Sequence, residues 1–326
     1  YTLLLDVAPL FIAVLITYIS HTYLQFSDNF AQKKQIRGAF EQYLSPSFIK
    51  QLTKNPSMLS LGGETRNITI LFCDVRKFTT ISEQFKDNPE DLIALLNRFL
   101  TPLTNVIMDS GGTIDKYMGD CIMAFWNAPI ELENHAADAC NAAAEMHKQL
   151  QVLNHTLANE GLMTLEMGIG INTGASVVGN MGSDKRFDYS VIGDAVNLAA
   201  RLEGQSKVYG VETLISASTA EESNLNFLEL DLIQVKGRND PVSIYTPTEY
   251  FLNAELDRET LVNMQAEFLR HYRNQEWGEA KSNLNRLKEL SPKYLTCGKE
   301  FAERISAREK QAKISNWDGV YVAVSK

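Results

Sequence analysis

The sequence has little cysteine and no excess of positive charge. Its four cysteines show no CxxC pair and no other metal-ligand spacing, and Cys73, Cys121 and Cys140 stand within apolar stretches. This pattern is not typical of a zinc module or a disulfide-stapled secreted domain. We expect reduced, buried thiols of a cytoplasmic domain.

The charge balance excludes one broad class of partner. The chain has 31 Lys and Arg residues against 40 Asp and Glu residues, a formal net charge of -9. Because binding to phosphate backbones calls for a basic face, we expect no nucleic-acid partner. With 326 residues, 44% hydrophobic and 22% charged, the composition is that of a folded protein with one sizeable domain and accessory pieces.

Residues 1–24 are apolar apart from Asp6, His21 and a few hydroxyls. This length suits a transmembrane helix, although a buried soluble helix has a similar pattern. A signal peptide is disfavoured because no basic region precedes the segment and no small-residue cleavage site follows it. The basic residues at 33, 34 and 37 predict that the rest of the chain is cytoplasmic, at an inner or plasma membrane.

The chain begins without Met inside this apolar segment, so we expect a longer protein with a sensor upstream. Residues 25–60 are predicted to form a juxtamembrane region, with a signalling helix over 25–44 that Pro46 stops and a linker into the domain over 53–66. A helix in this place is suited to pair with its copy and transmit a signal.

Two aspartates follow short apolar strands in the middle of the chain. Residues 68–73 predict a strand buried on both faces that ends at Asp74, and residues 111–125 predict a hairpin whose turn contains Asp120. A carboxylate at such a strand end binds a hard cation or caps the next helix. If the two strands are neighbours, both carboxylates share one rim and suit a two-cation clamp on a phosphoryl group.

The predicted order of elements is strand, helix, strand, strand, helix, strand. The helices lie over 88–106 and 135–159, the next strand over 165–171, and a further hairpin over 227–246. This order predicts an α+β fold, with an antiparallel or mixed sheet and helices on one face. Residues 251–326 then predict a small tail with two amphipathic helices, separated near 275–278 and stopped by Pro292. The tail resembles one tetratricopeptide-type unit, which must pack on the domain or a partner to be stable.

Three segments resemble the signature motifs of the class III adenylate and guanylate cyclases. They are FCDVRKFT at 72–79, DKYMGD at 115–120 and YSVIGDAVNLAAR at 189–201, in the order the family has them. Several independent motifs at compatible spacing are a specific signal. The resemblance extends over about residues 60–247 and implies a ferredoxin-like βαββαβ catalytic domain, which we place at 61–250.

The resemblance implies a two-metal site for nucleotide cyclisation. Asp74 and Asp120, with the backbone carbonyl of Val75, match the ligands of two Mg²⁺ or Mn²⁺ ions. Asn197 and Arg201 lie four positions apart, so a helix capped by Asp194 carries them on one face. In the family this amide contacts the ribose, and this guanidinium stabilises charge on the α-phosphate.

Phosphate and base contacts complete the implied site. Lys236 matches the family's phosphate-binding lysine, and Lys185, with Arg186, lies on a basic arm that reaches toward the terminal phosphates. Lys116 is the residue that accompanies adenine in the family, since an ammonium donates to a ring-nitrogen acceptor. Ser190 stands where many relatives carry aspartate and accepts from the adenine amino group. The sequence therefore predicts ATP as the substrate, with a guanylate or mixed-specificity cyclase as the alternative.

Assembly follows from the same resemblance. In the family the site lies between two domains, and this chain carries both complementary sets of residues. We therefore expect an adenylate cyclase that forms cyclic AMP and pyrophosphate as a head-to-tail homodimer. A non-catalytic dimerisation module is a second alternative, which the presence of both aspartates, Asn197 and Arg201 disfavours. The absence of a GG(D/E)EF signature argues against a diguanylate cyclase.

Overall fold

A computed structural model describes residues 12–26, residues 62–310 except 184, 239 and 255, and residues 317–323. The chain divides into two units, Tyr1–Leu59 and Ser60–Lys326. In the second unit, the described strands form one mixed sheet in the order β2-β3-β1-β4-β6-β8-β7-β9, with β5 paired to β4. The strands are β1 (Gly62–Val75), β2 (Thr113–Met118), β3 (Cys121–Trp126), β4 (Met167–Ser183), β5 (Arg186–Ile192), β6 (Thr213–Ser216), β7 (Phe227–Gln234), β8 (Val242–Pro247) and β9 (Tyr321–Val322).

The central strand β1 is longer than the sequence pattern predicts. It pairs antiparallel with β3 on one side and with β4 on the other, and its pairing with β4 begins at Gly62 opposite Asn180. The linker predicted over 53–66 is therefore wrong from residue 62 onward, because β4 extends far enough to supply backbone partners for this polar stretch. The part of that linker before residue 62 lies outside the described residues.

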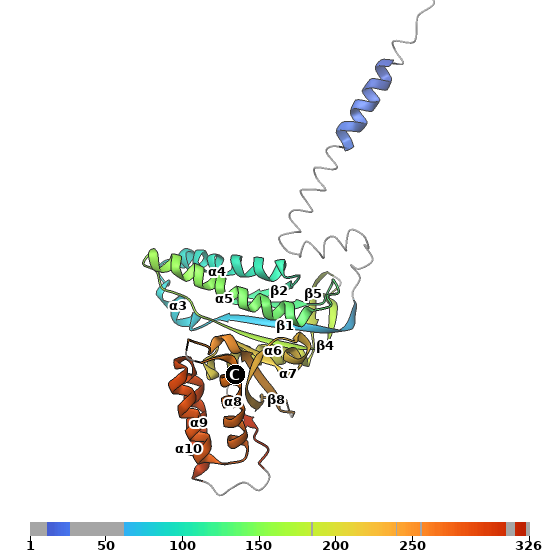
Figure 1. Ribbon diagram of the computed structural model, residues 1–326. Helices are drawn as coiled ribbons and strands as arrows, with labels where there is room; N and C mark the ends of the chain where they lie inside the picture. The colour runs from blue at the N-terminus through green and yellow to red at the C-terminus, as the bar shows by residue number, and fades with distance from the viewer. Residues whose placement is uncertain are drawn as a thin grey trace, which may run out of the picture. The chain divides into compact units, whose positions relative to one another are not determined.

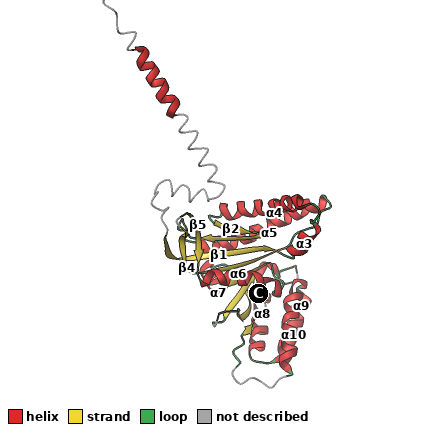
Figure 2. Ribbon diagram, turned by 180° about the vertical axis from the view of Figure 1, so that it is seen from behind, coloured by secondary structure: helices red, strands yellow, loops and turns green. Residues whose placement is uncertain are grey.

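Helices cover both faces of the sheet (Figures 1 and 2). On one face, α4 (Pro89–Asp109) and α5 (His135–Asn159) bury apolar side chains against Leu71 and Ile122. On the other face, α6 (Asp194–Tyr209) packs against residues such as Phe72 and Phe125. The expectation of helices on one face only is wrong, because β1 is apolar on both sides and needs a cover on each. The remaining helices of the domain are α3 (Phe78–Gln84) and α7 (Ala217–Ser223).

The C-terminal tail packs on α6 and β7 of the same unit. The two predicted helices are α8 (Arg258–Arg273) and α9 (Trp277–Leu290), and a third, α10 (Leu295–Glu309), follows the short 3-10 turn at Pro292–Tyr294. Another 3-10 turn at Thr248–Tyr250 precedes them. Apolar residues of the tail share one core with α6 and β7. Pro292 thus ends one helix, as predicted, but does not end the helical tail.

A buried polar network ties the tail to α6. The Tyr209 hydroxyl on α6 donates to Asp231 on β7 at 2.5 Å, and Arg304 of α10 donates to the same carboxylate at 2.6 Å. Asp231 is fully buried and Arg304 is 8% exposed at the side chain. Because an isolated charge here is very unfavourable, this pair fixes the docking of α10 on the domain.

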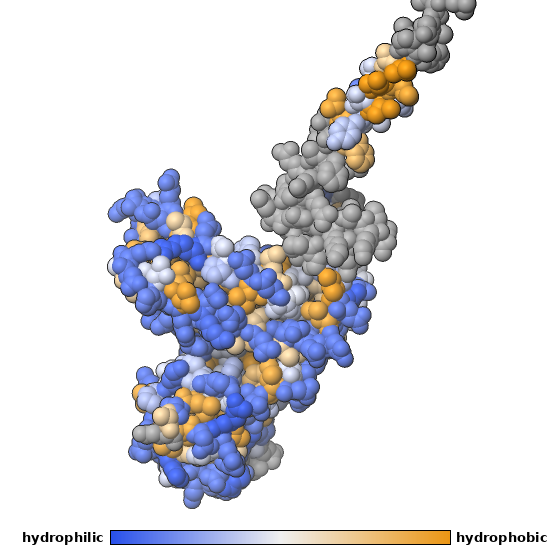
Figure 3. Space-filling view, turned by 45° about the horizontal axis from the view of Figure 1, so that its top comes forward, coloured by the Kyte–Doolittle hydropathy of each residue, from blue (hydrophilic) through white to orange (hydrophobic). Residues whose placement is uncertain are grey.

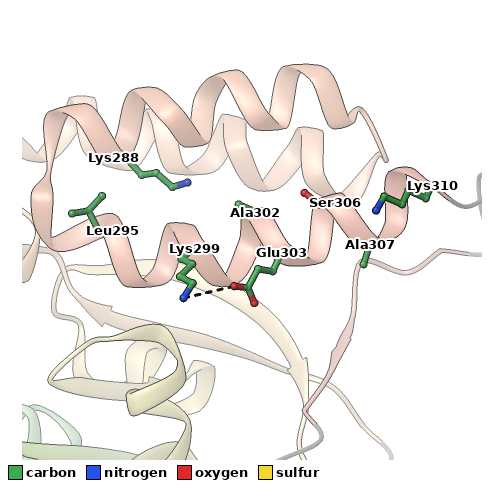
Figure 4. Close-up of a pocket in the computed structure, with 8 residues that line it drawn as sticks. All are labelled: Lys288, Leu295, Lys299, Ala302, Glu303, Ser306, Ala307 and Lys310. Carbon is green, nitrogen blue, oxygen red and sulfur yellow. Dashed lines mark ion pairs between the residues drawn. The ribbon is translucent and has the colours of Figure 1, made fainter.

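The open surface of the tail contains a shallow pocket of about 700 Å³ between α9 and α10 (Figure 4). It is lined by Lys288 of α9 and by residues of α10, where Lys299 and Glu303 pair at 3.9 Å. Leu295 and Ala302 supply its apolar surface. None of the residues that line it belongs to the predicted site.

In the first unit, residues 12–26 form a helix with exposed apolar side chains, seen as orange surface in Figure 3. Ile12 and Leu15 are among these exposed residues. No helix within the described ranges has the length and apolar character needed to cross a membrane. The structure therefore does not support the predicted span over residues 1–24, of which residues 1–11 are not described. The signalling helix predicted over 25–44 lies outside the described residues beyond residue 26.

Candidate active site

One cavity of about 930 Å³ gathers most of the predicted site residues. It lies where the end of β1, the β2–β3 turn, α6 and the loop after β7 meet. Its lining includes all three predicted metal ligands and three predicted substrate contacts: Asp74, Val75, Asp120, Asn197, Arg201 and Lys236. These residues are spread over more than 160 positions of the sequence, and the sheet brings them to one rim.

The two aspartates come together as the strand pattern predicts. Cys73 of β1 pairs with Ile122 of β3, so Asp74 near the end of β1 and Asp120 just before β3 lie at the same edge of the sheet. Gly119 takes the left-handed conformation (φ 68°) that the tight β2–β3 turn requires. Burial, and then contact with the Asp74 carboxyl, raises the pKa of Asp120 to about 7. Two carboxylates in contact repel each other unless a proton or a cation lies between them.

The donor chemistry of this edge fits a hard divalent cation. Two carboxylates and the adjacent carbonyl of Val75 offer oxygen ligands, which Mg²⁺ and Mn²⁺ prefer. Within the described part of the chain, no group of three or more His, Cys, Asp or Glu side chains is arranged to hold a metal. Nucleotide phosphates and water would therefore complete the coordination of an ion held by Asp74 and Asp120.

Glu203 is a cavity residue that the sequence analysis missed. It lies on α6, two positions after Arg201, and lines the same cavity as the aspartates. Burial, and then the nearby Asp74 charge, raises its pKa to about 7. Helical spacing gave no signal for it, because residues two positions apart on an α-helix do not share a face and Glu203 therefore lies away from the face of Asn197 and Arg201.

Helix α6 presents Asn197 and Arg201 to the cavity. Its N-cap is Gly193, so the prediction of Asp194 as the cap is wrong; Asp194 is the first helical residue and pairs with Arg238 at 3.6 Å. The Arg201 Nη1 atom is buried and has no hydrogen-bond partner among the described residues. A buried, unpaired guanidinium nitrogen in a cavity is a ready donor for an anionic ligand.

Close backbone contact with β4 fixes the position of α6. A Cβ atom at Gly170 would lie 2.1 Å from the backbone nitrogen of Glu203 and 2.4 Å from the carbonyl oxygen of Ala199. Only glycine therefore permits this helix to lie directly on the strand. At Gly237 the contact is milder, since a Cβ there would lie 3.3 Å from Nη2 of the flexible Arg201 side chain, and the left-handed backbone (φ 78°) is what favours glycine.

The two predicted base-contacting residues lie in a second group. The Ser190 hydroxyl donates to the Asp115 Oδ2 atom at 3.0 Å, and the Lys116 ammonium lies 3.7 Å from the same oxygen. Neither Lys116 nor Ser190 lines the cavity that holds Asp74. Lys185 belongs to neither group; it is exposed in the turn between β4 and β5. Burial raises the pKa of Asp115, and the contacts with Lys116 and Ser190 partly offset this rise.

Residues 62–254 match the sequence profile of the adenylate and guanylate cyclase catalytic domain. The match spans more than half of the chain and includes every residue of the cavity. The chain therefore belongs to this family of cyclases.

Curated relatives from bacteria have similar sequences. The chain is 35% identical over 208 residues to adenylate cyclase 1 of Rhizobium meliloti, covering 63% of this chain and 31% of that protein. It is 33% identical over 246 residues to the adenylate cyclase of Anabaena cylindrica, covering 72% of this chain and 47% of that protein. The chain thus matches about a third to a half of the length of these relatives.

Two solved structures are also similar. The guanylyl cyclase Cya2 is 41% identical with a TM-score of 0.52, covering 57% of this chain and 93% of that one. The adenylyl cyclase CyaB from P. aeruginosa is 37% identical with a TM-score of 0.52, covering 57% of this chain and 95% of that one. Relatives named for either base thus resemble this chain, so the choice of base must be argued from its own residues.

Proposed function

We propose that this chain is an adenylate cyclase, which converts ATP into 3′,5′-cyclic AMP and pyrophosphate at sites of a head-to-tail homodimer. The observation that carries the proposal is the unpaired Arg201 Nη1 atom in the same cavity as Asp74 and Asp120. A buried donor and a pair of half-buried carboxylates need opposite partners. A nucleotide triphosphate with divalent cations supplies both.

Each residue has a role that its position supports. Mg²⁺ or Mn²⁺ held by Asp74, Asp120 and the Val75 carbonyl would lower the pKa of the ribose 3′-hydroxyl and neutralise phosphate charge. Asn197 orients the ribose by hydrogen bonding, and Arg201 stabilises the charge that develops on the α-phosphate. Lys236 lines the cavity as an exposed cation for the phosphates, and Lys185, which does not line it, is a weaker candidate for the same role.

Base choice rests on Lys116 and Ser190. An ammonium donates to N1 of adenine, whereas guanine presents an N–H there. A guanylate or mixed-specificity cyclase is the second candidate, favoured by the 41% identity to Cya2. The adenylate cyclases of Rhizobium meliloti and Anabaena cylindrica support the first candidate.

The separation of the two residue groups supports a shared site. Within one chain the catalytic cavity does not include Lys116 or Ser190, so a second chain is needed to bring a base-recognition group to it. A two-fold dimer with equivalent interfaces provides two such sites.

The test is product formation from ATP and, separately, GTP with Mn²⁺, comparing the parent chain with Asp74→Asn. We expect cyclic AMP from the parent and a loss of at least about 100-fold in the variant, because one metal ligand is neutralised. Asp109→Asn is the matched control, since Asp109 is exposed at the end of α4. Cyclic GMP as the main product would favour the second candidate. No product from either nucleotide would contradict both and favour a non-catalytic module.

Attachment to an inner or plasma membrane, with the catalytic domain in the cytoplasm, remains a prediction from residues 1–24 and the basic residues after them. Alkaline extraction of membranes from cells that express the chain tests it. Release of the protein into the soluble fraction would contradict the prediction. The excess of acidic residues continues to argue against a nucleic-acid partner.

A further inference from the structure

A β-bulge places Asp115 next to both predicted base-contacting residues. Between β2 and β3 the register shifts at this residue, because Ile114 pairs with Ala124 and Lys116 pairs with Met123, with Asp115 left over. A bulge re-aims the extra side chain. Here that side chain reaches Ser190 of β5, while the next residue, Lys116, remains close to it.

One carboxylate oxygen of Asp115 lacks a hydrogen-bond partner among the described residues. Its side chain is fully excluded from solvent, and its Oδ2 atom accepts from Ser190 and faces the Lys116 ammonium. The other oxygen, Oδ1, is buried and has no hydrogen-bond partner among the described residues. Burying an acceptor without a partner costs stability, so folding alone does not explain this carboxylate.

The direction of the Ser190 hydrogen bond determines what a base can meet. A serine hydroxyl has one proton, and Ser190 donates it to Asp115. Only lone pairs then remain toward a ligand. The exocyclic amino group of adenine donates to such an acceptor, whereas guanine presents its O6 acceptor at the corresponding edge and is repelled.

We infer that Asp115 is a positioning residue for base selectivity: it holds Ser190 as an acceptor and Lys116 as a donor, and thereby makes the site select adenine over guanine. The carboxylate acts through these two side chains rather than by touching the reacting atoms. Lys116, with a side chain 47% exposed, stays free to donate on its outer side. This inference deepens the proposed function and rests on it for the role of the base.

The test measures binding rather than turnover, so it stands apart from the test of cyclase activity. Displacement of a fluorescent methylanthraniloyl nucleotide by 3′-deoxy-ATP and 3′-deoxy-GTP, with Mn²⁺, gives the ratio of the two dissociation constants. Both competitors lack the attacking hydroxyl and stay intact. The full chain is compared with Asp115→Ala, Asp115→Asn and Ser190→Ala.

Asp115→Ala frees the Ser190 proton for donation to guanine O6, so we expect the preference for adenine to fall about tenfold. Asp115→Asn keeps a carbonyl acceptor for Ser190 and should retain most of the preference. Ser190→Ala should lose the preference for adenine as Asp115→Ala does. If Asp115→Ala does not fold, Ser190→Ala and Asp115→Asn carry the test. The matched control is Asp188→Ala, which removes an exposed carboxylate from the same strand as Ser190.

An unchanged ratio in both alanine variants at positions 115 and 190 would overturn the inference. An equal loss of the preference for adenine in Asp115→Asn and Asp115→Ala would also overturn it, because the charge of Asp115 alone would then set the preference. A parent that binds adenine selectively but forms no cyclic nucleotide would contradict the proposed function while leaving the role of Asp115 intact.

Discussion

At the scale of single residues, the site contains two kinds of unusual polar group. One is a buried nitrogen without a hydrogen-bond partner among the described residues, and the other is a carboxylate in contact with a second carboxylate. Asp120 has a raised pKa because it is buried beside Asp74, and Arg201 has a buried nitrogen without a described partner. Such groups cost stability in the free protein. Their concentration in one cavity indicates that binding energy, rather than folding, explains them.

Another buried residue gives a test of stability against pH. His147 of α5 lies 3.0 Å from the Thr213 hydroxyl, and burial, followed by the nearby Arg76 charge, lowers its pKa to about 4. Because the folded state favours the neutral imidazole, His147 contributes stability above its unfolded pKa. That contribution is lost as pH falls from about 6.5 toward 4.

The measurement is urea unfolding of the parent and of His147→Gln at pH 8 and pH 5. Between pH 8 and pH 5 we expect the free energy of unfolding of the parent to fall by about 2 kcal/mol more than that of the variant. Carboxylates with raised pKa values contribute more to stability as the pH falls. Both proteins have the same carboxylates, so their contributions cancel in the comparison. Parallel losses in parent and variant would show that His147 titrates normally.

At the scale of elements, the position of α6 determines which side chains reach the cavity. This helix contributes Asn197, Arg201 and Glu203 to the cavity. Its opposite side packs in the core that it shares with the tail, and Tyr209 at its end joins the network with Asp231 and Arg304. The tail therefore holds the C-terminal end of the helix that carries Asn197 and Arg201.

Gly170→Ala tests the close approach of α6 to β4. The added methyl group would collide with backbone atoms of α6, so we expect the variant to lose about 1–3 kcal/mol of stability and most of its cyclase activity. Gly278→Ala is the matched control, because a Cβ at that position of α9 meets no atom within 4 Å. The control should be neutral or slightly more stable. Equal behaviour of the two variants in thermal unfolding would contradict the packing described here.

Much of this element-level arrangement was predictable from sequence. The alternation of strand and helix patterns gave the order from β1 to β4, and the positions of Asp74 and Asp120 followed from strand ends. Three features were not predictable. The extension of β1 depends on a partner strand more than 100 residues away, α10 follows a proline that ends another helix, and the bulge at Asp115 has no local signature.

At the scale of the whole molecule, one chain contains two separate groups of site residues. The cavity residues lie at the end of β1 and along α6, and the two residues predicted to contact the base lie around Asp115. The sequence indicated both groups but not their separation, because spacing along the chain does not fix distances across a sheet. A complete site within one chain and a site shared between two chains predict different outcomes for mixed variants.

The most direct test of a shared site mixes equal amounts of two impaired chains, Asp74→Ala and Lys116→Ala, and measures cyclic AMP formation with Mn²⁺. If each site combines the cavity of one chain, which holds Asp74 and Arg201, with Lys116 of its partner, random pairing yields half heterodimers, each with one intact site. About a quarter of the parent activity should then return. A mixture no more active than the two variants alone would contradict the shared site and place Asp74 and Lys116 of each site in the same chain.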